Sequence, residues 1–310
     1  MNKITTNLWF DNQAEEAANF YISAFGDGSI GRKLYYTEAG QEVHGQKPGT
    51  VMTVDFRILD HDFVGLNGGA VFTFNPSISF LVNFDPSRDE NAQESLDKAW
   101  NILAEGGTQL MPLQEYPFSK HYGWIQDKYG VSWQLMLTKP EGEPRPAITP
   151  SIMFVGANCG KAEEAGEFYL SIFKNSQKGT VARYPAGMEP EKEGTVMFSD
   201  FMLEGQWFAA MDSAHEHEFA LNEAVSFVVN CTDQAEVDYY WGKLSAVPES
   251  EQCGWLKDKY GVSWQIVPTE FLDILTNSGD DPAKYGRVME AMMKMKKLDL
   301  AELRAAADGS

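Results

Sequence analysis

Apolar and polar residues alternate in short runs at the start of the chain and follow a helical period in one longer run. Residues 4–10 alternate like a strand, and residues 14–25 carry their alanines and aromatic residues at helical spacing. Three further strand-like runs follow at 29–36, 50–59 and 63–67, separated by a loop rich in glycine and proline and by a polar turn. The pattern therefore predicts a β-α-β-β-β unit.

A second unit of the same kind follows. Residues 77–84 predict a strand, and residues 91–106 predict a helix that stops at a glycine pair. A hairpin at 123–134 then closes the unit: a Trp-aliphatic pair enters an Asp-Lys-Tyr-Gly loop and leaves it in a run rich in Val, Trp and Leu. Two such units are expected to make one domain, whose sheets curl around a shared cleft.

The hairpin occurs twice in the chain. Residues 123–134 and 254–265 agree at ten of twelve positions, and ordered matches to the first half begin just after residue 150. Matches that keep their order and spacing indicate that a whole domain has been duplicated. Alternation in the last strand puts Gln134 and Gln265 on the face away from the tryptophans, so these amides are expected to face a cleft rather than the helices.

The duplication and the composition of the connecting segments divide the chain into four parts. Residues 1–139 form the first domain, 140–150 a proline-rich linker, 151–268 the second domain, and 269–310 a tail without a counterpart in the first half. The tail has apolar residues, several of them methionines, at helical intervals. It is predicted to be helical and to pack on the second domain, although a methionine-rich groove for a partner is an alternative.

Charge and cysteine content narrow the classes of function. The chain has 45 acidic and 25 basic residues, a net charge of −20, which disfavours nucleic acid or an anionic membrane as a partner. No run is apolar enough for a signal peptide or a membrane span, so a cytoplasmic location is expected. The three cysteines, Cys159, Cys231 and Cys253, have no metal-ligand spacing and are interpreted as reduced thiols.

Several segments together resemble the PhnB-like family of the vicinal oxygen chelate superfamily, which includes glyoxalases, bleomycin-resistance proteins and extradiol dioxygenases. The resembling segments are Leu8-Trp9-Phe10-Asp11, Ala14-Glu15-Glu16-Ala17, Phe20-Tyr21, Leu66-Asn67-Gly68-Gly69, Ile78-Ser79-Phe80 and both copies of the hairpin. The resemblance implies an α+β fold of two tandem glyoxalase-like domains, each of paired βαβββ modules, here followed by the helical tail. Members are often labelled 3-demethylubiquinone-9 3-methyltransferase.

The resemblance also implies where a site would lie. In metal-dependent members, ligands from the first, fourth, fifth and last strands of a domain converge on a divalent ion in the cleft. The cleft candidates carried over for the first domain are Asn7, Trp9, Asn67, Ser79 and Gln134; those for the second domain are Met153, Asp212, Ser226 and Gln265. Amides and hydroxyls are poor ligands for Zn²⁺ or Ni²⁺, so neither a metal nor another cofactor is predicted, although the family allows a divalent ion.

The expected function is binding of a small molecule in the cleft without a full metal centre. One alternative is a lyase, isomerase or dioxygenase of the superfamily with a non-standard site, and another is a structural or assembly protein with vestigial clefts. No catalytic residue is identified, and Gln134 has the alternative role of satisfying polar groups inside the sheet. Because single-domain relatives commonly dimerise, the halves are expected to form an internal pseudo-dimer; a homodimer is a further option.

Other chemically notable residues have simpler interpretations. His215 and His217 resemble a ligand pair but lie in a polar loop, where solvated histidines are the usual case. His121 precedes the first hairpin and is a candidate base at the cleft mouth, against the alternative of an inert surface residue. Cys253 replaces Tyr122 in the repeat, and a buried, unreactive thiol is the commoner outcome at such a position.

Overall fold

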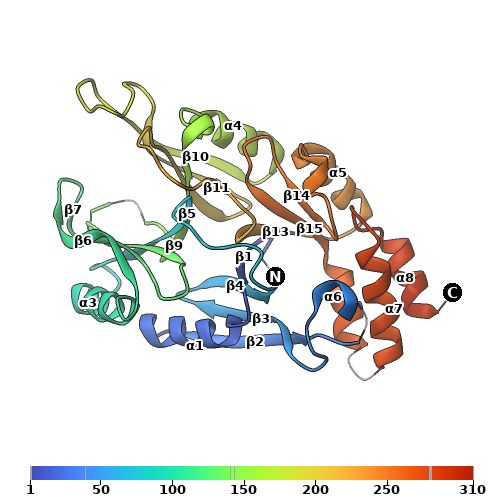
Figure 1. Ribbon diagram of the computed structural model, residues 1–310. Coiled ribbons are helices and arrows are strands. Elements are labelled where there is room, and N and C mark those ends of the chain that lie inside the picture. The colour runs from blue at the N-terminus through green and yellow to red at the C-terminus, as the bar shows by residue number, and fades with distance from the viewer. Residues whose placement is uncertain (1, 39, 140, 143, 279–280, 310) are drawn as a thin grey trace.

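The computed structural model describes residues 2–38, 40–139, 141–142, 144–278 and 281–309. Within these residues, two mixed sheets of seven and eight strands form the framework, with helices around them (Figure 1). The alternating runs of the sequence become strands because one face of each run is apolar and packs inward. No helix among the described residues has both the length and the apolar character needed to cross a membrane.

The first sheet has the strand order β14-β15-β13-β1-β4-β3-β2. Its strands are β1 (Ile4–Phe10), β2 (Gly28–Tyr35), β3 (Val51–Ile58), β4 (His61–Asn67), β13 (Val225–Cys231), β14 (Trp255–Lys257) and β15 (Ser263–Pro268). The strands from β1 to β4 come from the first half of the chain, and those from β13 to β15 come from the second half. In Figure 1 the blue and the orange strands accordingly lie together.

The second sheet has the order β10-β11-β12-β9-β5-β8-β7-β6. Its strands are β5 (Ile78–Phe84), β6 (Thr108–Tyr116), β7 (Ser119–Gln126), β8 (Ser132–Leu137), β9 (Ile148–Phe154), β10 (Ser176–Arg183), β11 (Val196–Leu203) and β12 (Gln206–Asp212). Both halves again contribute. Strand β9 begins inside the segment predicted as linker, and linker residues 140 and 143 lie outside the described residues.

The helices begin and end close to where the sequence patterns place them. They are α1 (Ala14–Phe25), α2 (Gln41–His44), α3 (Ala92–Leu103), α4 (Ala162–Ile172), α5 (Gln234–Leu244), α6 (Thr269–Asn277), α7 (Pro282–Met293) and α8 (Leu300–Asp308), with short 3-10 turns at Gly156–Asn158 and Pro248–Ser250. Helices α1 and α4 start with glutamates in the first turn, where the helix dipole favours negative charge. The first half therefore has its predicted pair of βαβββ modules. In the second half, the last module has two strands, β14 and β15, after its helix α5 within the described residues.

Each half keeps an aromatic core between its two modules. In the first half, Tyr21 of α1 lies 5.0 Å from Trp133 of β8, measured between ring centroids. In the second half, Tyr169 and Trp264 occupy the equivalent places at 5.4 Å. These rings are fully buried. The apolar faces of the two modules in each half therefore pack against each other and against the helices.

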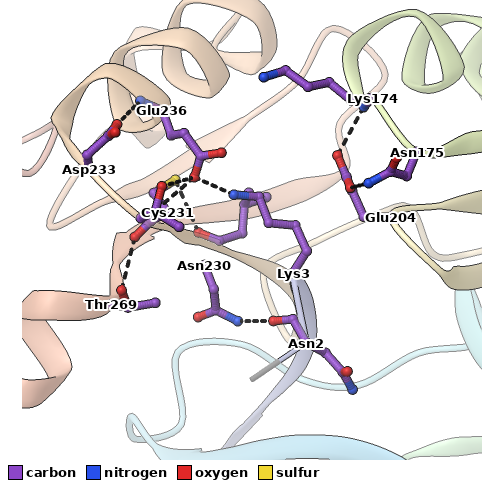
Figure 2. A network of polar contacts seen from close by, with 12 residues as sticks. Asn2, Lys3, Lys174, Asn175, Glu204, Asn230, Cys231, Asp233, Glu236 and Thr269 are labelled. Atoms are coloured by element: carbon purple, nitrogen blue, oxygen red, sulfur yellow. Dashed lines mark hydrogen bonds and ion pairs between the residues drawn. The ribbon is translucent and has the colours of Figure 1, made fainter.

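Each sheet is formed by strands of one half pairing with strands of the other half. Strand β1 pairs antiparallel with β13, and β5 pairs antiparallel with β9, so that Asn7 lies opposite Ser226 and Ser79 lies opposite Ser151. Side-chain contacts reinforce the first of these joints: Lys3 forms an ion pair with Glu236 of α5, and Figure 2 shows the Asn230 amide donating to the main-chain oxygen of Asn2.

The prediction that each half encloses its own cleft is therefore wrong. Each open sheet face combines one module from each half, and the two halves form an internal pseudo-dimer. The physical reason is that the two copies have nearly the same strand patterns, so the edge of β1 or β5 fits the strand of either copy equally well.

Candidate functional site

The structure regroups the predicted cleft residues. Asn7 and Trp9 of β1 share the first sheet with Ser226 and Gln265, which were assigned to the other cleft. Conversely, Ser79 and Gln134 share the second sheet with Met153. The grouping by domain is corrected for the reason given above: the open face of each sheet is built across the two halves.

Asn67 and Asp212 face the helices instead of a cleft. The Asn67 side-chain oxygen accepts from the backbone N–H of Ala14 at 2.9 Å, at the start of α1. Asp212 accepts from the backbone N–H of Ala162 at 3.1 Å, at the start of α4. Both side chains thus satisfy helix N-termini, and neither lines a cavity described below. Alternation explains the correction, because Asn67 shares its face of β4 with the core residue Phe63.

A cavity of ≈ 680 Å³ lies on the open face of the first sheet, beneath α6 and α7. We call it the roofed cavity. Its floor includes Asn7, Val64 and Leu66, and its roof includes Phe271 and Met289. The volume and the mainly apolar walls are those of a small-molecule site.

The roof comes from the tail, whose position differs from the prediction. Tail residues Phe271 and Met289 share an apolar cluster with Leu34 of the first half as well as Val267 of the second. The Tyr285 hydroxyl also donates to the main-chain oxygen of Tyr35 at 3.1 Å. The tail therefore packs across both halves, because the apolar surface it needs is the mixed first sheet.

The roofed cavity has three amide side chains, Asn7, Asn230 and Gln265, beside its hydroxyl and charged groups. The Gln265 Nε2 donates to Ser226 Oγ at 3.0 Å. The Asn230 amide is used by the chain itself, since it donates to the main-chain oxygen of Asn2 at 2.8 Å and to Thr5 Oγ1 at 3.1 Å. Asn7 is different: it is 3% exposed, and its Nδ2 has no hydrogen-bond partner among the described residues.

Two ion pairs lie at the wall of the roofed cavity. Arg32 contacts Asp55 at 3.0 Å, and Arg57 contacts Asp62 at 3.0 Å. All four residues line the cavity, so its charged side chains balance. Burial raises the pKa of the Asp55 carboxyl, and the adjacent Arg32 partly opposes that rise.

The residues that line the roofed cavity do not fit the divalent metal that the family allows. Within the described ranges, no group of three or more His, Cys, Asp or Glu side chains is placed to hold a metal ion. Both carboxylates of the wall are engaged by arginines, and Cys253 is a single thiol whose pKa is raised by burial. The rest of the polar lining offers amide and hydroxyl groups, which are weak ligands for Zn²⁺ and Ni²⁺. No chemical step is derived through such an ion.

The second sheet has a smaller cavity of ≈ 370 Å³, which we call the second cleft. Linker residue Arg145 lies in it, with its Nε 2.8 Å from Asp200 and its guanidinium 4.0 Å from the Trp207 ring centroid. Trp207 and Asp200 also line this cleft. The linker thus takes up space that stays open in the roofed cavity.

Gln134 pairs with polar groups of the protein itself, which was the alternative role predicted for it. Its Nε2 donates to Ser79 Oγ at 2.8 Å, and its Oε1 accepts from the Tyr122 hydroxyl at 2.7 Å. Cys253, which lines the roofed cavity, replaces Tyr122 in the repeat, so Gln265 lacks the matching hydroxyl. The two hairpin glutamines therefore have different environments despite identical local sequences.

The remaining candidates have ordinary partners. His121 Nε2 lies 2.6 Å from Asp97, and His217 contacts the Ser213 hydroxyl at 2.9 Å. His215 is 60% exposed in the side chain. Cys253 lines the roofed cavity, and burial raises the pKa of its thiol, which agrees with the unreactive interpretation.

Sequence reasoning missed Arg32 and Asp55. A signal for Asp55 was present: it matches Asp200 in the repeat, and both aspartates lie on the open face of their sheets beside an arginine. No local signal marked Arg32, because the arginine of the second cleft comes from the linker instead of the matching strand.

Comparison with known proteins agrees with this architecture. The family model described as 3-demethylubiquinone-9 3-methyltransferase matches residues 2–136 and 146–267. A PhnB protein of Bacillus cereus is 40% identical, with 44% of this chain and 99% of that protein covered and a TM-score of 0.38. A Staphylococcus aureus protein is 34% identical, with 45% and 98% covered and a TM-score of 0.18.

Solved structures of glyoxalase I are similar over most of the chain. Glyoxalase I of Zea mays is 14% identical, with 89% of this chain and 97% of that protein covered and a TM-score of 0.50, a likeness that shows the fold. No curated protein matches the sequence. Because the family model covers most of both halves, the chain belongs to the PhnB-like family described as 3-demethylubiquinone-9 3-methyltransferase, whose domain it carries twice in tandem.

Proposed function

We propose that this chain binds a small molecule in the roofed cavity. The observation that carries the proposal is the cavity itself: ≈ 680 Å³ between the first sheet and the tail, with mainly apolar walls and a buried amide nitrogen, Asn7 Nδ2, that has no partner among the described residues. Pockets for small ligands have this volume and this combination of apolar surface with a few polar groups. The second cleft is a weaker candidate because Arg145 lies in it.

We further propose that binding needs no full metal centre. The lining amides, hydroxyls, arginine-paired carboxylates and single Cys253 thiol support this proposal, because together they are not the donor set that Zn²⁺ or Ni²⁺ selects. Metal analysis of the purified chain is expected to find less than one equivalent of divalent ion. One tightly held equivalent in the roofed cavity would contradict the proposal.

A thermal-shift screen with a matched pair of variants tests the binding site. Val228 lines the roofed cavity, and Leu81 lines the second cleft at the same position of the repeat. Compounds that raise the melting temperature of the wild type are expected to do so for Leu81→Trp but not for Val228→Trp, because bound ligand stabilises by mass action and the larger ring fills the roofed cavity. Hits that persist in Val228→Trp would place binding elsewhere.

Asp55 favours a second candidate function, an enzyme of the superfamily with a non-standard site. Its carboxyl lines the roofed cavity, burial raises its pKa, and a carboxyl in contact with a ligand can give or take a proton. If a lyase, isomerase or dioxygenase activity is found with a screened ligand, Asp55→Asn is expected to abolish turnover and to keep the thermal shift. Unchanged turnover in that variant would exclude Asp55 as the acid or base.

A further inference from the structure

Two buried hydrogen-bond donors of the roofed cavity have no partner among the described residues. They are Nδ2 of Asn7 and Nε of Arg32. Both residues line the cavity, and Asn7 is buried in the sheet floor with 3% of its surface exposed. Buried donors are nearly always paired, so each of these atoms needs an explanation. Because both atoms are donors, a molecule that pairs with them must supply hydrogen-bond acceptors.

The second sheet shows that an amide at the Asn7 position is not required by the fold. Ser151 takes this position in the repeat, and its strand forms the same antiparallel pair: Ser151 lies opposite Ser79 as Asn7 lies opposite Ser226. The strand therefore forms with a small hydroxyl there. The Asn7 amide therefore occurs only in the first sheet, where Asn7 lines the roofed cavity.

The charge of the lining limits the ligand further. Arg32 and Arg57 are matched by Asp55 and Asp62, so the lining has no net charge for a ligand ion to neutralise. The chain as a whole carries −20, which disfavours the approach of anions. A charged ligand would also lose its hydration in a mainly apolar cavity without gaining a counter-charge.

From these observations we propose that the roofed cavity selects a neutral, largely apolar molecule with a carbonyl-type acceptor, and that the Asn7 amide donates to this acceptor. The inference rests on the proposed function, since it concerns the ligand of the same cavity. Selection follows because a ligand without the acceptor leaves the buried Asn7 donor unpaired, whereas a ketone, ester or amide satisfies it.

The test uses two neutral dyes that differ in one acceptor group. Prodan is a dimethylaminonaphthalene with a propionyl ketone, and its partner is the dimethylaminonaphthalene without the ketone. Dissociation constants for the full chain are measured by equilibrium dialysis and by energy transfer from tryptophan. The wild type is expected to bind Prodan about ten-fold tighter than the ketone-free dye, the preference that one hydrogen bond to a buried donor provides.

The variants separate a specific role of Asn7 from a general one. Asn7→Leu keeps the branching and the number of side-chain heavy atoms, and is expected to reduce the preference for the ketone to about one, with the affinity for the ketone-free dye unchanged or higher. Asn7→Asp removes the donor with little change of shape and is expected to lower the preference in the same direction. Ser151→Ala, at the matching position of the second sheet, is expected to keep the wild-type preference. Circular dichroism checks that each variant is folded.

The outcomes distinguish failure of this inference from failure of the proposed function. If both dyes bind the wild type and the ketone preference is absent, or survives in Asn7→Leu and Asn7→Asp, the role assigned to Asn7 is wrong and binding in the cavity stands. If neither dye binds the wild type, the proposed small-molecule site is contradicted together with its selectivity.

Discussion

At the scale of single residues, the most repeated motif of the chain proves to be a structural device. Asp127 in the hairpin loop accepts from the backbone N–H groups of Tyr129 and Val131 and from Nε1 of Trp133, the last at 2.9 Å. Asp258 makes the same set of contacts in the second copy, including a 2.9 Å bond from Trp264. Burial raises the pKa of Asp127 to about 6. The motif is thus explained by a carboxylate that ties the loop to the core tryptophan.

His61 leads to a prediction about acid sensitivity. Its ring is buried between the Thr6 hydroxyl at 3.0 Å and Gln206, and burial, assisted by Arg57, lowers its pKa to about 3. The folded state therefore keeps the ring neutral, while the unfolded chain binds a proton near pH 6.5. The neutral His61 ring therefore adds to the free energy of unfolding above pH 6.5. This contribution is lost as the pH falls toward the pKa of His61 in the folded state.

The change from pH 7 to pH 5 is expected to reduce the free energy of unfolding of the wild type by about 2 kcal/mol more than that of His61→Gln. The substitution is conservative in this fold, because Gln206 already stands at the matching position of the repeat. Urea denaturation at both pH values measures the difference. Equal losses in the two proteins would show that His61 does not titrate on unfolding.

At the scale of elements, the linker between the halves is part of a sheet face. Arg145 forms an ion pair with Asp200, which is 7% exposed, and stacks over Trp207. Removing the arginine leaves a buried carboxylate with one fewer cationic partner. Arg145→Ala is therefore expected to lower the free energy of unfolding by on the order of 3 kcal/mol.

A nearby arginine provides the control for this experiment. Arg88 is 55% exposed in the side chain, and its ion pair with Asp85 has a separation of 3.7 Å. Arg88→Ala is expected to cost less than about 1 kcal/mol, as exposed pairs do. Guanidinium denaturation of both variants compares them. Similar small losses would mean that the linker arginine does not stabilise the second cleft.

At the scale of the whole molecule, the halves are joined through shared sheets. Each sheet contains strands from both halves, paired across β1 and β13 and across β5 and β9. Separating the halves would expose two new strand edges and the apolar residues beside them. The halves are therefore expected to unfold together.

Chemical denaturation followed by tryptophan fluorescence and by circular dichroism is expected to show one coincident transition. Phe80→Ala in the first half and Phe227→Ala in the second are matched core truncations, since both rings are fully buried at the same position of the repeat. Each is expected to cost about 3–5 kcal/mol and to move the whole transition. A second transition in either variant would show that the halves are independent.

Local elements followed from the sequence with small errors. Strand β1 has the predicted bounds, and α1 begins and ends where its apolar period does. Strand β6 (Thr108–Tyr116) was not predicted, since it is a largely exposed edge strand interrupted by Pro112 and lacks a buried face to create alternation. Of the predicted site residues, Asn7 and Gln265 do line one cavity, although they were assigned to separate clefts.

The sequence by itself determined the duplication, the order of strands and helices, and which face of each strand is apolar, because these depend on neighbouring residues and on the spacing of side chains. Only the tertiary structure decided which modules share a sheet, where the tail packs, and which of two nearly identical hairpins keeps an open cavity. Repeated segments offer equivalent edges, so local pattern cannot choose between them. The choice depends on contacts between residues far apart in the chain: Arg145 with Asp200 in the second cleft, and the tail over the first sheet.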